Sequence, residues 1–178
     1  QETHDVVAKA QEYLDSKAKG PKPRSVSAPN ASFVVPKIRA GMSSDSHVVT
    51  LVDERFLDIA NREDVKEVVS AGVSSADHML RIRPFSMVVD DSTAEGIEQA
   101  FSSYRADYDA YTERNLSLLP EGYELFPGVP RVALVPGLGA ITAGKNVAEA
   151  RMVAEIALHT HRVAAQAIDC FGRGEAMP

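Results

Sequence analysis

The sequence lacks several features that each mark a class of protein. It has one cysteine, Cys170, so no disulfide can form within the chain, and a buried or half-buried, inert thiol in a reducing compartment is expected. No apolar run approaches the ~20 residues of a membrane-spanning helix. The net charge is −6, with 19 Lys and Arg against 25 Asp and Glu, and broad nucleic-acid binding needs a basic face. The sequence thus predicts no nucleic-acid partner, no membrane partner and a cytoplasmic location.

Spacings that bring metal ligands or a nucleophile together are also missing. No Cys-x-x-Cys or His-Glu-x-x-His occurs, and the Gly-x-Ser-x-Gly elbow of many hydrolases is absent. His159 and His161 lie two apart in a helical pattern, so they point in nearly opposite directions and cannot share a metal. Glu155, His159 and Arg162 are typical of a solvated helix face. We therefore predict no metal ligands in this chain, and the catalytic residues stay unknown.

Length and composition fit one ordinary domain with a core. The chain has 178 residues, 44% of them hydrophobic and 25% charged. Residues 1–25 predict a helix over 2–17 followed by a linker that contains Gly20-Pro21 and Pro23. Residues 26–178 predict an α/β domain. The chain opens on Gln1 rather than Met, and we expect it to be a piece of a longer protein.

Three short apolar runs, 47–52, 85–89 and 131–135, predict strands. The first is expected to be buried on both faces, as in a parallel sheet covered by helices, and the third is also expected to be buried. Helical patterns alternate with them, which favours the α/β class. Ser92-x-x-Glu95 reads as a capping box, and Tyr104, Tyr108 and Tyr111 form a stripe typical of core or interface packing on the helix that follows. The other helices are predicted over 31–39, 54–61, 63–71, a turn within 74–80, and 146–171, with Gly41 and Gly72 as stops.

Residues 136–146 form a glycine-rich segment between the third predicted strand and the last helix. Gly139, Gly144 and Lys145 match the phosphate-loop spacing Gly-x-x-x-x-Gly-Lys, but Asn146 stands where a Ser or Thr would bind Mg²⁺. Backbone N–H groups in such a turn, with the positive end of a helix, favour an anion. Three interpretations stay open: glycines that serve only a tight turn, an anion site without triphosphate chemistry, and a nucleotide-binding phosphate loop.

Residues 74–83 carry the most site-like cluster of polar side chains. Two serines precede Asp77 and His78, and Arg81 and Arg83 follow. Arginines and hydroxyls can hold a phosphate or carboxylate, although a helix cap followed by surface charges explains the same residues without a ligand. The candidate substrate- or anion-binding residues are Asp77, His78, Arg81, Arg83, Gly137, Gly139, Gly144 and Lys145.

Four stretches of the chain follow one another as in a known family. Residues 1–14 resemble one of its helices, and Pro36-Lys37-Ile38-Arg39-Ala40-Gly41 resembles Pro-x-[Leu/Ile]-Arg-Gly with Ala40 added. Residues 75–84 resemble Thr-Pro-Asp-His-Leu-Ile-Arg-Thr-Lys-x-Pro. Residues 130–139, with Gly144-Lys145, resemble Pro-Arg-Val-x-Leu-Val-Pro-Gly-Leu-Gly and a following Gly-Lys. The chain thereby resembles the aldolase-like (class II aldolase/adducin-type) region of a bifunctional rhamnulose-1-phosphate aldolase/short-chain dehydrogenase, as a fragment.

This resemblance implies a class II aldolase/adducin-like three-layer sandwich, as a partial or degenerate repeat with a long C-terminal helix. It implies Zn²⁺ held by histidines, a Lewis acid for the enediolate, and NAD for the dehydrogenase half of the parent. Both cofactor segments are absent from this sequence, and Pro136-Gly137 stands where class II aldolases have His-Gly. We therefore expect no cofactor and little activity in the fragment alone.

The resemblance also implies the partners. They are the remaining aldolase and dehydrogenase regions of the parent chain, further copies in a homo-oligomer, and a sugar phosphate. Two other functions remain open. One is a non-catalytic module for oligomerisation or domain docking, which the tyrosine stripe and the long last helix fit. The other is a nucleotide binder of the phosphate-loop kind.

Overall fold

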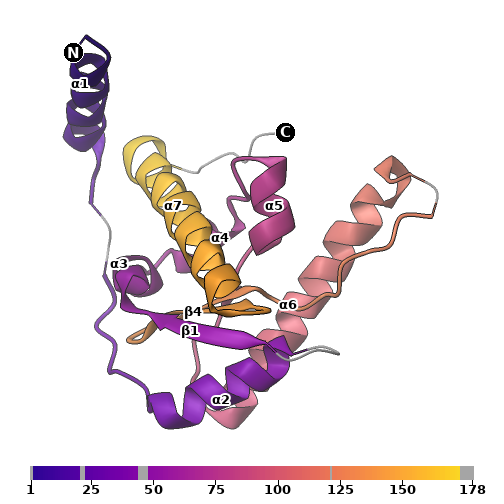
Figure 1. The fold of residues 1–178 in the computed structure, drawn as a ribbon. Coiled ribbons are helices and arrows are strands. Elements are labelled where there is room, and N and C mark those ends of the chain that lie inside the picture. The colour runs from indigo at the N-terminus through magenta and orange to yellow at the C-terminus, as the bar shows by residue number, and fades with distance from the viewer. Residues whose placement is uncertain (1, 21–22, 44–47, 121, 173–178) are drawn as a thin grey trace.

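The computed structural model describes residues 2–20, 23–43, 48–120 and 122–172. Within them a four-stranded sheet has the order β1-β4-β3-β2 (Figure 1). The strands are β1 (Val49–Asp53), β2 (Met87–Val88), β3 (Val132–Val135) and β4 (Gly139–Gly144). The central strand β4 runs antiparallel to β1 and β3, and β2 runs parallel to β3. The sheet is therefore mixed, not parallel as predicted.

Residues 136–138 of the glycine-rich segment form a turn, as predicted, but residues 139–144 form a strand, so the prediction that the turn leads directly into the last helix was wrong. Leu138 N–H donates to the Val135 carbonyl at 3.0 Å and closes a tight turn, after which Val135 pairs with Gly139. All six residues of β4 are buried. The strand–loop–helix geometry of a phosphate loop is absent, because six residues of sheet separate the turn from the next helix.

Glycine is required in β4 by close backbone approach. Gly139 has φ +105, and a Cβ there would overlap the backbone carbonyl oxygen of Asp53 in β1. A Cβ on Gly144 would overlap the backbone nitrogen of Ala150 at the start of the last helix. Close backbone approach within the sheet, rather than a tight strand-to-helix turn, thus requires glycine at these two positions.

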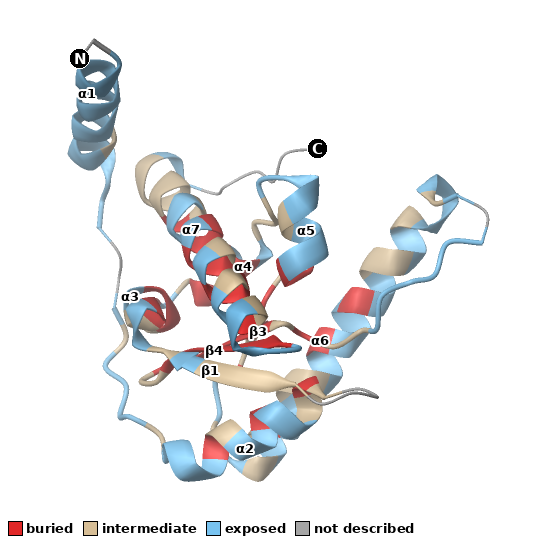
Figure 2. Cartoon of the chain, viewed as in Figure 1, coloured by how far each residue is buried: buried red, intermediate tan, exposed pale blue. Residues whose placement is uncertain are grey.

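Helices lie against both faces of the sheet, over two cores (Figure 2). Val132 and Leu134 of β3 face a core shared with α3, α4 and α7, whereas Ala133 and Val135 face a core shared with α2 and α6. The side chains of β3 alternate between the two cores, so the strand is buried throughout, as predicted. The helices are α1 (Glu2–Lys17), α2 (Ala31–Met42), η1 (Glu54–Phe56), α3 (Leu57–Ala60), α4 (Val65–Ser70), α5 (Ala76–Ile82), α6 (Ala94–Asn115), η2 (Leu116–Leu118) and α7 (Val147–Phe171).

The two outer strands differ from their predictions. β1 is an edge strand with half-buried residues, and Val52 is 43% exposed, so it is not buried on both faces. His47, where this strand was predicted to begin, lies outside the described residues. β2 has only two residues and pairs only with β3 among the described strands. The pattern of apolar residues predicts that a segment forms a strand, but the elements packed beside the strand determine how far it is buried.

Helix ends follow their capping side chains. Asn146 accepts from Glu149 N–H at 2.9 Å and starts α7, as predicted. α6 starts one residue later than the predicted capping box, because Thr93, not Ser92, accepts from Gly96 N–H at 3.1 Å. α2 does not stop at Gly41 but runs to Met42.

The N-terminal helix stands apart from the sheet and contacts the end of α7 (Figure 1). Lys19 N–H donates to the Asp169 carbonyl at 3.1 Å, and the half-buried thiol of Cys170 donates to the Leu14 carbonyl at 3.2 Å. Nearby, the buried Arg62 forms ion pairs of 2.8 Å with both Asp64 and Asp169, and these fix the α3–α4 connection to α7. Among the described helices, none combines the length and apolar character that crossing a bilayer requires.

Candidate functional site

Two adjoining cavities beside the edge strand β2 form the candidate site. Their volumes are about 610 and 820 Å³, and both have Ser70, Phe85 and Asp107 in their walls. We call them together the β2 groove. Its walls are α4 and the start of α5 on one side and α6 on the other, with residues 84–88 between them. Groups from four distant segments thus share one concave surface, the usual form of a small-molecule site.

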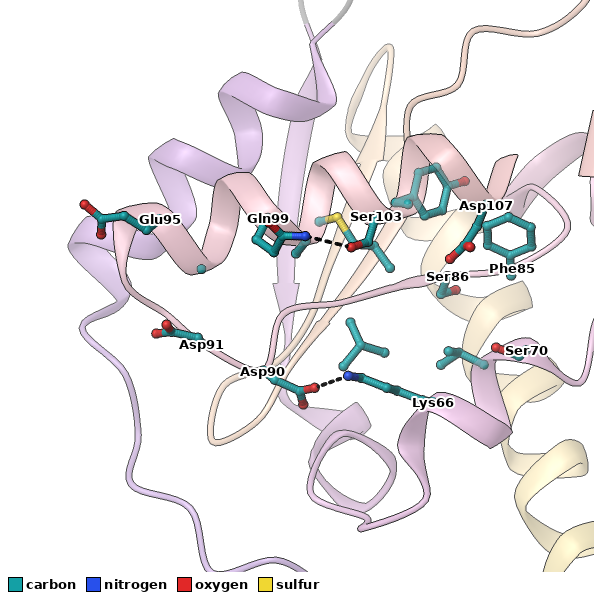
Figure 3. A pocket seen from close by; sticks show the side chains of 16 residues that line it. Lys66, Ser70, Phe85, Ser86, Asp90, Asp91, Glu95, Gln99, Ser103 and Asp107 are labelled. Atoms are coloured by element: carbon teal, nitrogen blue, oxygen red, sulfur yellow. Dashed lines mark hydrogen bonds and ion pairs between the residues drawn. The ribbon is translucent and has the colours of Figure 1, made fainter. Parts of the chain in front are cut away.

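The first half of the groove is acidic and contains one ion pair (Figure 3). Lys66 Nζ lies 2.7 Å from an Asp90 oxygen, and Arg24 binds the other oxygen at 3.1 Å. Burial raises the pKa of Asp90, but the hydrogen bonds from Lys66 and Arg24 outweigh burial and leave the pKa below its ordinary value. Asp91, Glu95 and Asp107 line the same half, together with the hydroxyls of Ser70, Ser86 and Ser103.

Ser86 of this wall is hydrogen-bonded to a buried histidine. Its Oγ lies 2.8 Å from Nε2 of His161 on α7. His161 is 2% exposed, and burial lowers its pKa to about 4, so the imidazole is neutral at pH 7. Its Nδ1 has no hydrogen-bond partner among the described residues, and Phe56 packs edge-on against the ring. A neutral imidazole can exchange a proton with the Ser86 hydroxyl that borders the groove.

Sequence reasoning missed His161. It predicted a solvated face around Glu155, His159 and Arg162, and these three are indeed exposed. His161, however, follows the buried Val153 and Ala157 by eight and four residues, so it belongs to the apolar stripe of α7. That spacing was the signal in the sequence that could have found it.

The second half of the groove begins at the serine pair before α5. Ser74 and Ser75 line it, with Tyr111 and Arg114 on the α6 side. Ser75 also accepts from His78 N–H at 3.2 Å and caps α5. His78 Nδ1 lies 2.9 Å from Ser74 Oγ and 3.3 Å from Thr160 Oγ1, so this histidine joins α5 to α7.

The candidate residues of α5 fall into three environments. Asp77 and Arg81 are exposed and lie 3.9 Å apart, a weak pair at helical spacing. His78 is half-buried against α7, and Arg83 is buried under the ring of Phe126. None of the four lines the β2 groove. Their predicted contact with a sugar phosphate stays a prediction.

The candidate residues of the glycine segment lie elsewhere. Gly137 N–H donates to Asn61 Oδ1 at 2.8 Å, and Lys145 N–H donates to Glu149 at 2.7 Å, so both donors are already occupied. Gly139 and Gly144 are buried in the sheet. His78 contacts Thr160, whereas Lys145 adjoins the first turn of α7, and 13 helical residues span roughly 20 Å. The structure therefore does not bring the two candidate sets together.

Comparison with known proteins identifies the family. The model of the family described as aldolase class II, second domain, matches residues 29–172. The chain belongs to this family. It is also 22% identical over 172 residues to the uncharacterized oxidoreductase YuxG of Bacillus subtilis (strain 168), covering 85% of this chain and 24% of that protein. The chain thus spans about a quarter of the length of that relative. No solved structure matches.

The described residues of this aldolase second domain do not fit the zinc that the family resemblance implies. No three His, Cys, Asp or Glu side chains within them lie close enough to hold a metal ion. His78 and His161 each bind a hydroxyl instead. Asp107 and Asp109 diverge on α6: Asp107 lines the groove, and Asp109 lies near Gly128. No reaction step is therefore assigned to a metal in this domain.

Proposed function

We propose that this class II aldolase second domain is part of a bifunctional sugar-metabolism enzyme, of the rhamnulose-1-phosphate aldolase/short-chain dehydrogenase type. By itself it has no aldolase activity. The family match over residues 29–172 carries this proposal. The similarity to a much longer protein named as an oxidoreductase supports it. Zinc and NAD then belong to other regions of the parent enzyme, which are this domain's partners.

We propose further that the fold is a degenerate class II aldolase/adducin-like three-layer sandwich. The helices against both faces of the sheet support this assignment. In the class II aldolase pattern His-Gly stands where this chain has Pro136-Gly137, and here that dipeptide forms the β3–β4 turn rather than a metal site. Loss of the histidine fits a repeat that keeps the architecture without the chemistry.

The β2 groove is the surface through which the domain contributes to the parent enzyme. Hydroxyl groups line both halves, and Arg114 on the rim has no ion-pair partner in the part of the chain that the structure describes. Hydroxyls and a free guanidinium suit a polyhydroxylated, phosphorylated ligand. The serines that line the groove are Ser70, Ser74, Ser75, Ser86 and Ser103.

Filling the groove tests this role. Ala110 lines the groove on α6, whereas Ala106, one turn earlier, does not. In the full-length gene product, Ala110→Trp is expected to lower kcat/KM for cleavage of rhamnulose 1-phosphate by about tenfold or more, since it occupies the ligand's space. Ala106→Trp carries the same helix penalty and should stay within about twofold. Equal rates for both variants would remove the groove from the mechanism, and a wild type that does not cleave this substrate would refute the enzyme assignment.

A non-catalytic docking or oligomerisation module is the second candidate, favoured by one observation. Beyond the sheet, the end of α6, η2 and the following loop stand away from the body (Figure 1). Large apolar side chains there are exposed: Leu116, Leu118, Tyr123, Leu125 and Phe126. Such a patch marks an interaction surface more often than isolated exposed residues do.

Sedimentation over a concentration series tests this second candidate. Leu118 is 78% exposed, and Leu118→Glu is expected to weaken self-association by about tenfold or more if the patch is the contact. Val163→Glu places the same charge on an exposed position of α7 and serves as the control. A wild type that stays monomeric at every concentration would exclude the oligomerisation function.

A further inference from the structure

Arg83 is a buried cation without a counter-ion among the described residues. It is 6% exposed, and no ion pair or hydrogen bond from its guanidinium is found among the described residues. Its Nε is buried without a partner. Arginine is almost never buried unless it is paired. Arg62 is similarly buried but forms ion pairs with two aspartates, whereas Arg83 forms no ion pair with the described residues.

The backbone conformation of Arg83 is strained. Its φ is +70, and no other described residue except glycine has a positive φ. This conformation costs of order 1 kcal/mol or more for an L-residue, and Pro84 next to it narrows the choice further. Strain of this kind persists where the surroundings enforce it, and it gathers at functional sites.

One face of the guanidinium is covered, and its edges are free. The Phe126 ring lies 4.4 Å from Cζ and stacks on the flat face. The five N–H donors of arginine point outward in the plane of the group, so stacking leaves them available. Tyr108 Oη donates to the Phe126 carbonyl at 3.2 Å and ties this loop to α6.

The groups that most affect the charge of Arg83 are hydroxyls and one cation, Arg131, which is itself paired with Glu149 at 2.6 Å. After burial, the side chains that most affect the pKa of Arg83 are Tyr108, Arg131, Tyr104 and Tyr123. Burial, above all, lowers the pKa of Arg83. The Tyr104 hydroxyl is buried without a partner, on a side chain that is 4% exposed. Arg83 and Tyr104 thus each have a buried donor without a partner among the described residues, and each acts on the other's pKa.

We infer that Arg83 and Tyr104 bind a small oxyanion, a carboxylate or a phosphate group, beneath Phe126. The arginine fork offers two parallel N–H donors to such a group, and the tyrosine hydroxyl offers a third donor. The anion supplies the negative charge that the protein omits at this position. Tyr104 also lines the first half of the β2 groove, so the site adjoins the groove, but neither Arg83 nor Phe126 lines it.

Substitution of Arg83 separates a binding role from a structural one. If Arg83 only supported the fold, Arg83→Met would lower the melting temperature. If it awaits an anion, Arg83→Met removes an uncompensated buried charge, and the melting temperature without anion stays level or rises. Tyr104→Phe likewise removes a buried, unpaired hydroxyl and should not destabilise the chain.

Calorimetry and thermal melts of the full chain give the test, with inorganic phosphate and sodium acetate as separate probes and sodium chloride to match ionic strength. One probe is expected to bind with a millimolar or tighter Kd and, near saturation, to raise the melting temperature by roughly 5 °C. Arg83→Met should abolish the rise, and Arg83→Lys and Tyr104→Phe should weaken binding about tenfold. Arg151→Met, at an exposed position of α7, should keep the full rise.

The results distinguish a phosphate ligand from a carboxylate ligand and test whether Arg83 binds an anion at all. A rise with phosphate alone assigns a phosphorylated ligand, and a rise with acetate alone assigns a carboxylate. If neither probe binds the wild type up to tens of millimolar, or if Arg83→Met melts lower and binds as well as the wild type, the inference is wrong.

Discussion

Replacing Gly139 by alanine is expected to lower the free energy of unfolding by about 3–5 kcal/mol, a loss that most single substitutions do not reach. Two effects add. The residue has φ +105, which an L-side chain rarely adopts, and the new Cβ would overlap the Asp53 carbonyl in the neighbouring strand. Because β4 is central, moving either strand disturbs both cores. Urea denaturation followed by circular dichroism measures the loss.

Gly20→Ala is the matched control for this prediction. Gly20 also has a positive φ, +72, but a Cβ there meets nothing within 4 Å. It should cost only about 1 kcal/mol, the backbone part of the effect. If the two alanine variants were equally stable, the close approach of β1 to Gly139 would be refuted.

The second large effect is a loss of stability in mild acid, caused by His161. Its pKa is about 4 in the folded protein and about 6.5 in the unfolded chain. Above pH 6.5 neither state binds the proton. As the pH falls from 6.5 to 4, the unfolded state takes up a proton that the folded state excludes, so the free energy of unfolding falls by about 3 kcal/mol.

Urea denaturation at closely spaced pH values between 7 and 4 checks this effect. His161→Gln does not titrate and should flatten the pH dependence in that window, whereas His159→Gln, at an exposed position, should leave it unchanged. The carboxylates act at lower pH, because the side-chain hydrogen bonds from Arg55 and Arg131 hold the pKa of Asp53 and Glu149 below their ordinary values. A wild type with flat stability from pH 6.5 to 4 would contradict the burial of a neutral His161.

The sequence predicted correctly those elements that depend on residues close together in the chain. The apolar run 131–135 gave β3, and Asn146 gave the start of α7. β4 was missed because four of the six residues of Gly139–Gly144 are glycine or alanine, which have low strand preference, and the nearby Lys145 completed a misleading phosphate-loop spacing. This segment forms a strand because it is buried between β1 and β3, and such tertiary contacts are not visible in the local sequence pattern.

The site could be predicted only in fragments. Ser74 and Ser75 were noticed beside the residues that sequence reasoning favoured, yet the β2 groove also takes Lys66, Phe85 and Ser103 from separate elements. No spacing along the chain connects such residues, because packing of α4, β2 and α6 creates the surface. Arg83 was singled out by its motif, but only the structure shows that it is buried and without a counter-ion.

The strand order has a consequence for how the chain is made. β1 and β2 lie at opposite edges and never touch, and each pairs only with the β3–β4 hairpin. When the ribosome has synthesised the chain as far as residue 130, both strands therefore exist without the strands that they pair with. At typical synthesis rates, β1 waits roughly 5–20 s for Gly139–Gly144 to be made. During that interval the nascent chain exposes strand edges that chaperones, or other nascent chains, can bind.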